Sequence, residues 1–189
     1  MADDFLGDRR RALEEEFFRR QENALLQQLR STQTQESAQE ALATATGVRD
    51  SAVLAKLSAL GITSDTLLAL GLVPLVAVAW ADGALDDKER QAIVSGLSSA
   101  GIAADSPAAR LVQGWLTSPP PASLLETWSA YTATLAAALA PDERDQLRAS
   151  VLGRARAVAE AAGGFLGFGQ RVSKPEEDLL AKLAQAFGA

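Results

Sequence analysis

The feature that most constrains the fold is a long apolar run that ends abruptly at Asp82. We call the segment from Asp82 to Glu89 the acidic turn. Between Asp65 and Asp82 the chain carries no charged residue, and Gly83 follows at once. Asp-Gly is typical of a turn, and the next charged segment, Asp86 to Glu89, has the acid-x-x-Glu spacing that opens a helix. The run is shorter than the roughly 20 residues that cross a bilayer. We therefore expect a buried helix, a tight loop and a second helix.

The rest of the chain also repeats apolar residues at helical spacing and shows no sustained two-residue alternation. Aromatic residues make up only 5% of the 189 residues, and the alanine-rich remainder favours closely packed helices. The sequence predicts an all-α fold, and Ser123 with Glu126 is predicted to form a capping box. Helices are expected over 49–60, 65–81, 86–100, 107–116, 123–139, 141–162 and 173–187.

Charged residues are concentrated near the N-terminus, where positions 3 to 30 hold seven acids and six arginines. Apolar residues recur there at helical spacing, which predicts an amphipathic helix over residues 1–30. The polar segment 31–49 is predicted as a linker or short helix, and 50–189 as a separate helical domain. The N-terminal helix either folds back on this domain or binds a protein partner. In the second case the partner-binding residues are Leu13, Phe17, Phe18 and Leu25.

A family resemblance rests on the segment around the acidic turn. An apolar helix ends in Ala81-Asp82-Gly83, and Leu85, Asp86 and Glu89 follow. This pattern resembles the TerB family of tellurite-resistance proteins, an all-helical domain that also occurs in fragments of membrane-associated co-chaperones. The resemblance covers about residues 50–189. It implies a TerB-like bundle of two similar halves, with the N-terminal helix as an addition.

A second segment of the chain is similar to the first. Val172-Ser173-Lys174-Pro175-Glu176 corresponds to Leu85-Asp86-Asp87-Lys88-Glu89, and an apolar residue follows four positions later in both. This internal likeness agrees with two similar halves. We expect the helix after Asp86 to pack against the helix after Ser173.

The carboxylates of Asp82, Asp86 and Glu89 allow two interpretations. Without cysteine or histidine the chain offers only oxygen ligands, which suit Ca²⁺, Mg²⁺ or Mn²⁺ rather than zinc or copper. The TerB resemblance implies metal binding by clustered acids from both halves. Alternatively, the acids serve as helix caps and a turn. Where the second half would repeat Ala-Asp-Gly, the chain has Gly163–Gly169 without a carboxylate, so at most half of the cluster remains, plus Glu176.

The sequence also predicts positions for two groups of large apolar residues. Trp80, Trp115 and Trp128 lie on helical stripes and are predicted to be core residues. The Gly163–Gly169 segment, with its phenylalanines and leucine, is expected either to plug the core or to contact a membrane or a partner.

Charge and composition argue against several classes of function. A net charge of -6 and a pI of about 4.8 argue against a nucleic-acid binder, which needs a basic surface. The lack of histidine and cysteine removes the commonest general base and the thiol nucleophile. The N-terminus lacks the apolar core of a secretion signal, so we expect a cytoplasmic location.

The predicted function is therefore a non-enzymatic interaction or adaptor module, with a role in stress response that the TerB resemblance implies. An alternative is a structural subunit or regulator that clamps a larger, membrane-proximal complex through its N-terminal helix, with peripheral membrane association. A third is a hydrolase that uses a metal ion at Asp82, Asp86 and Glu89 to activate water.

Overall fold

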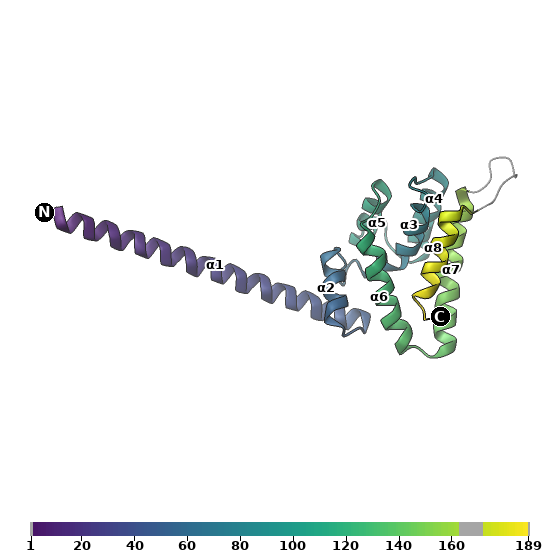
Figure 1. Ribbon diagram of the computed structural model, residues 1–189, viewed down its shortest axis with the longest axis horizontal. Coiled ribbons are helices and arrows are strands. Elements are labelled where there is room, and N and C mark those ends of the chain that lie inside the picture. Colours follow the sequence, from purple (N-terminus) through teal and green to yellow (C-terminus); the bar gives the residue numbers. More distant parts are fainter. Residues whose placement is uncertain (1, 163–171, 189) are drawn as a thin grey trace. The chain divides into compact units, whose positions relative to one another are not determined.

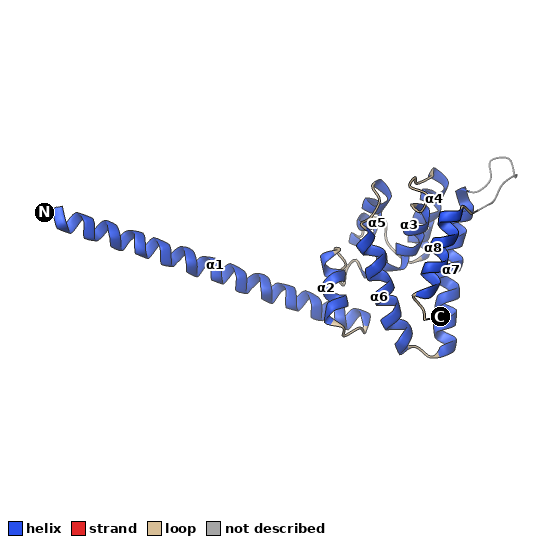
Figure 2. Cartoon of the chain, in the orientation of Figure 1, coloured by secondary structure: helices blue, strands red, loops and turns tan. Residues whose placement is uncertain are grey.

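The computed structural model describes residues 2–162 and 172–188, with side chains described from residue 20 onward except at 22–24 and 162. The described residues form helices and connecting loops, with no strand among them (Figure 2). This confirms the predicted all-α class. Packing divides the chain into two compact units, residues 1–40 and 41–189, each of which is described by itself.

The first unit is the N-terminal part of one long helix, α1 (Ala2–Thr46). A linker or short helix was expected over 31–49, but α1 runs through this segment without a break. The hydroxyls of Ser31, Thr32 and Thr34 donate to backbone carbonyls three or four residues back, at 2.8–3.0 Å. The polar side chains thus find partners within the helix and do not interrupt it.

The end of α1 belongs to the second unit. Leu42 is fully buried there, and the helix ends at Gly47, which has a φ of 70°. The N–H of Gly47 donates to the carbonyl of Ala43 at 2.9 Å. A left-handed glycine just past the last turn is a common helix stop, so this glycine, and not the polar segment before it, sets the boundary.

The second unit is built around a short central helix. Its elements are α2 (Ser51–Ala59), the 3₁₀ helix η1 (Leu67–Leu72), α3 (Val73–Ala79), α4 (Asp87–Ser99), α5 (Pro107–Thr117), α6 (Ala122–Ala138), α7 (Pro141–Ala162) and α8 (Lys174–Gln185). Six of the seven residues of α3 are buried. It packs against η1, α4, α6, α7 and α8 (Figure 1). A helix that is apolar on all sides is stable only when covered in this way.

The segment predicted as one helix over 65–81 is divided into two elements. The Thr66 hydroxyl accepts from the Thr63 N–H and donates to the Gly61 carbonyl, both at 2.8 Å, which forms a turn. The 3₁₀ helix η1 follows, and α3 begins at Val73 with Pro74 in its first turn. Proline has no N–H to continue a preceding helix, which explains the division at this point.

Two further expectations are corrected. Helices α4 and α8 do not pack mainly on each other. Both lie against α3 and α7 instead. Ser123 and Glu126 form no capping box: the N-cap of α6 is Pro121, two residues before Ser123, and the helix has no side-chain cap. Pro121 has the extended backbone typical of an N-cap residue, with φ of -62° and ψ of 146°.

The tryptophans largely follow the prediction. Trp115 and Trp128 are buried, whereas Trp80 is half-buried and packs against the core. The Gly163–Gly169 segment lies outside the described residues. Within the described part of the chain, no helix has the length and apolar character that a membrane span requires.

Candidate functional site

The loop after α3 is a turn closed by Asp82. The Asp82 Oδ1 accepts a hydrogen bond from the N–H of Ala84 at 3.1 Å. Gly83 has a φ of 91°, and its N–H donates to the carbonyl of Trp80 at 3.0 Å. This is an Asx-turn, in which the carboxylate replaces a backbone acceptor and glycine takes the left-handed conformation.

The next helix, α4, begins with a capping box. Asp86 Oδ1 accepts from the N–H of Lys88 at 2.7 Å, and Glu89 Oε2 accepts from the N–H of Asp86 at 3.0 Å. Backbone N–H groups at a helix start have no partner within the helix, and these two carboxylates supply one. The acid-x-x-Glu spacing in the sequence therefore forms the predicted cap.

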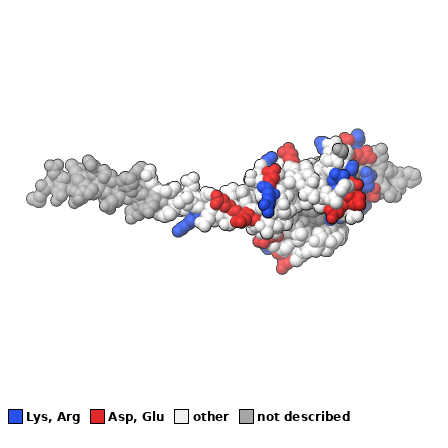
Figure 3. All heavy atoms as spheres, turned by 90° about the horizontal axis from the view of Figure 1, so that it is seen from below, with Lys and Arg blue, Asp and Glu red and all other residues white. Residues whose placement is uncertain are grey.

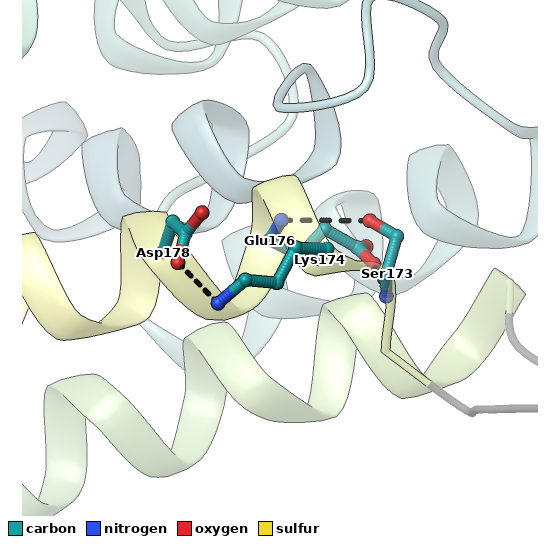
Figure 4. A network of polar contacts seen from close by, with 4 residues as sticks. All are labelled: Ser173, Lys174, Glu176 and Asp178. Carbon is teal, nitrogen blue, oxygen red and sulfur yellow. Dashed lines mark hydrogen bonds and ion pairs between the residues drawn. The ribbon is translucent and has the colours of Figure 1, made fainter.

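Helix α8 begins in the same way (Figure 4). The N–H of Ser173 donates to Glu176 Oε2, and the N–H of Glu176 donates to Ser173 Oγ at 3.4 Å. On the outer side of the first turn, Lys174 Nζ lies 2.7 Å from Asp178 Oδ1. Glu176 therefore has the same local role in α8 that Glu89 has in α4.

Both capping glutamates are buried, which is unusual for this residue type. Glu89 is 3% exposed and Glu176 is 6% exposed. The pKa of Glu89 is raised to about 7. Burial is the largest cause, the hydrogen bond from the Asp86 N–H lowers the pKa, and the negative charges of Glu176, Asp82 and Asp86 also raise it. Near neutral pH, Glu89 thus takes up a proton far more readily than an exposed glutamate does.

The predicted metal ligands are close enough to interact electrostatically, but each is already used as a cap or turn. No group of three or more Asp, Glu, His or Cys side chains in the described part of the chain has an arrangement that could hold a metal ion. The hydrogen bonds of Asp82, Asp86 and Glu89 fit the capping interpretation. Metal binding stays a prediction.

Two neighbours of the acidic turn bind the end of another helix. Trp80 Nε1 donates to the carbonyl of Trp115 at 2.9 Å, and an Arg90 guanidinium nitrogen donates to the carbonyl of Leu116 at 2.7 Å. These carbonyls lie in the last turn of α5, where the helix offers them no partner. The sequence patterns did not identify Arg90, because no local spacing links it to α5.

The first unit carries a separate candidate surface. Leu25 is 57% exposed, Leu26 43% and Leu29 57%. We call these three residues the leucine face. Leu25 was predicted from the helical stripe, whereas Leu13, Phe17 and Phe18 lie outside the residues whose side chains are described. The leucine face therefore holds the described part of the predicted partner-binding surface.

One face of the second unit carries charges of both signs. Figure 3 shows acidic and basic side chains alternating over the face in view, with no extended basic area among the described residues of that face. Such a surface offers no continuous track for a phosphate backbone.

Comparisons with known protein families, with curated proteins and with solved structures gave no match.

Proposed function

We propose that this protein is a non-enzymatic interaction module whose N-terminal helix binds a protein partner through the leucine face. The observation that supports this most directly is the exposure of Leu25, Leu26 and Leu29 on a helix segment that forms a compact unit of its own. An adaptor role in stress response remains what the TerB resemblance implies, and a cytoplasmic location remains the expectation from the N-terminal sequence.

The geometry of the helix supports a protein partner in particular. Leu25 and Leu29 are four residues apart, so they lie one turn apart on the same side of the helix. Recognition of a helix by a groove uses anchors at this spacing. A single helix gains little stability in water without tertiary packing, so a partner that covers the leucine face would also stabilise the helix.

Affinity capture with paired variants tests this proposal. The full-length chain is used as bait beside a Leu25→Gln/Leu29→Gln variant and a Gln27→Ala/Gln28→Ala control in the same helix. We expect a protein that the parent and the control retain and the leucine variant loses, with the same difference when that protein is purified and titrated. Equal binding by all three baits would contradict the proposal.

We further propose that the second unit is TerB-like, with two similar halves. In support, α4 and α8 both start with a capping box whose Glu is buried. Both helices are followed by a left-handed glycine, Gly101 with φ of 71° and Gly188 with φ of 76°. The chain spacing between the two glutamates equals that between the two glycines, so the likeness extends over a whole helix. A solved structure whose halves superpose over α4 and α8 tests this; halves that differ in helix order would contradict it.

A second candidate function is cation binding by the acidic turn. The observation in its favour is the concentration of negative charge around the buried Glu89, where Glu176, Asp82 and Asp86 all raise its pKa. A bound Ca²⁺, Mg²⁺ or Mn²⁺ would offset that charge. Millimolar metal should then raise the melting temperature, because only the folded loop presents the ligands. The absence of any shift in the parent protein would end this hypothesis.

A further inference from the structure

An apolar cavity of about 320 Å³ opens on the second unit, away from the acidic turn. Its lining comes from η1, the end of α4, α6, α7 and the segment after α8, and most of the side chains are aliphatic or aromatic. The lining residues used below are Leu68, Gly71, Trp128, Tyr131, Arg154 and Phe187.

Part of the cavity wall is buried and part is exposed. The rings of Trp128 and Phe187 form an edge-to-face pair with centroids 6.2 Å apart, and both side chains are almost fully buried. Leu68, by contrast, is 57% exposed. An exposed large aliphatic side chain at a preformed apolar cavity indicates a surface that a ligand can cover.

Arg154 gives the cavity a preference for ligands with a negative charge. It is the only charged residue among the described residues that line it. Its Nε donates to the carbonyl of Ser150 at 3.4 Å, and no ion pair links it to an acid in the described part of the chain. A guanidinium group pairs well with a carboxylate, often through two parallel hydrogen bonds.

We propose that this cavity binds a small anionic amphiphile, a fatty carboxylate whose alkyl chain lies against Trp128 and Phe187 and whose carboxylate pairs with Arg154. The volume lies at the lower end of the range for small-molecule sites, roughly 300–1,000 Å³. It suits one alkyl chain of medium length. A partner helix would need a longer groove with several successive anchor positions.

Calorimetric titration of the full-length protein with decanoate, below its micelle concentration, tests the proposal. Decan-1-ol and decyltrimethylammonium carry the same chain with a neutral and a cationic head. We expect saturable binding of decanoate and at least about tenfold weaker binding of the other two, because only the carboxylate pairs with arginine. Equal affinity for decanoate and decan-1-ol would overturn the assignment of Arg154, and no binding of decanoate would overturn the site.

Substitutions locate the ligand. Arg154→Gln should weaken decanoate binding about tenfold and leave decan-1-ol unchanged, whereas Arg156→Gln, an exposed arginine of the same helix outside this cavity, should change neither. If Arg154→Gln and Arg156→Gln have the same effect, the charge acts only at long range and the proposal fails.

A cavity-filling variant tests the position of the alkyl chain. Gly71 lines the cavity, and a Cβ atom there would meet no atom within 4 Å. Gly71→Leu should therefore fill part of the cavity and weaken both decanoate and decan-1-ol. Independently of that variant's folding, decanoate should change tryptophan emission in the parent, and Trp128→Phe should remove this change. Emission that still responds without Trp128, or binding of anionic vesicles without binding of decanoate, would contradict the proposal.

Discussion

Glu89 and Glu176 hold the same position in two different helices: each is the third residue, is buried, and accepts a hydrogen bond from the N–H of its N-cap residue. The charge of Glu176 contributes to the raised pKa of Glu89. The two helix caps are therefore electrostatically linked, although α4 and α8 pack mainly against α3 and α7.

The raised pKa of Glu89 predicts that stability falls as pH rises. Burial and the neighbouring acids move this pKa from 4.5 to about 7 in the folded state, so between these values the folded protein binds more protons than the unfolded chain. The free energy of unfolding should thus decrease from pH 5 to pH 8, by at most roughly 3 kcal/mol for this one group. Urea unfolding at several pH values measures it.

Glu89→Gln separates this effect from that of other acids. Glutamine keeps an oxygen that can accept from the N–H of Asp86 but does not ionise, so the pH dependence should flatten and the variant should gain stability relative to the parent at pH 8. Glu177→Gln, at an exposed position of α8, should leave the parent's slope unchanged. A slope that Glu89→Gln does not alter would show that Glu89 does not titrate in this range.

The Asx-turn predicts the effect of changing Asp82 without metal. Asp82→Ala removes the acceptor for the Ala84 N–H and should destabilise the protein by about 0.5–1.5 kcal/mol. Asp82→Asn retains an oxygen acceptor and should cost less. If Asp82→Ala is neutral or stabilising in metal-free buffer, the turn contributes nothing and the charge of Asp82 is unfavourable.

The hydrogen bond between Arg90 and the end of α5 gives a prediction outside the acidic turn. Arg90→Met keeps an apolar stem but loses the bond to the Leu116 carbonyl, and it should lower the free energy of unfolding by about 1–2 kcal/mol. Arg110→Met, at an exposed position on α5, is the matched control and should change it little. Chemical denaturation measures the free energy of unfolding of both variants. Equal losses of stability would show that Arg90 has no specific role.

Local signals in the sequence predicted much of this structure. The acid-x-x-Glu and Ser-x-x-Glu spacings formed caps at Asp86 and Ser173, and Ser106 caps α5 through its hydroxyl. Gly61 and Gly101 directly follow the helices predicted over 49–60 and 86–100, and both have the left-handed conformation that commonly ends a helix. These features depend on a few neighbouring residues, which is why local patterns predict them. The pattern is not sufficient, because the same Ser-x-x-Glu spacing at Ser123 and Glu126 forms no cap.

Some of the errors come from local structure and others from tertiary packing. The hydroxyls of Ser31, Thr32 and Thr34 bond back to the helix, so a composition typical of linkers was compatible with a continuous helix. Pro74 and the turn at Thr66 divided the segment 65–81 for a similarly local reason. Other features depend on tertiary packing. The burial of Glu176, the contact of Arg90 with α5 and the packing of α4 and α8 on α7 join residues far apart in sequence, and no periodicity carries that information.

The central claim, that the leucine face binds a protein, is tested most directly by amide hydrogen exchange with and without the captured partner. In the isolated protein, residues 20–40 should exchange quickly, because Leu25, Leu26 and Leu29 are exposed, whereas the buried α3 should exchange slowly. On addition of the partner, protection should increase in residues 20–40 and stay unchanged in α3. Slow exchange of residues 20–40 in the isolated protein, or partner protection confined to residues 41–189, would contradict the claim.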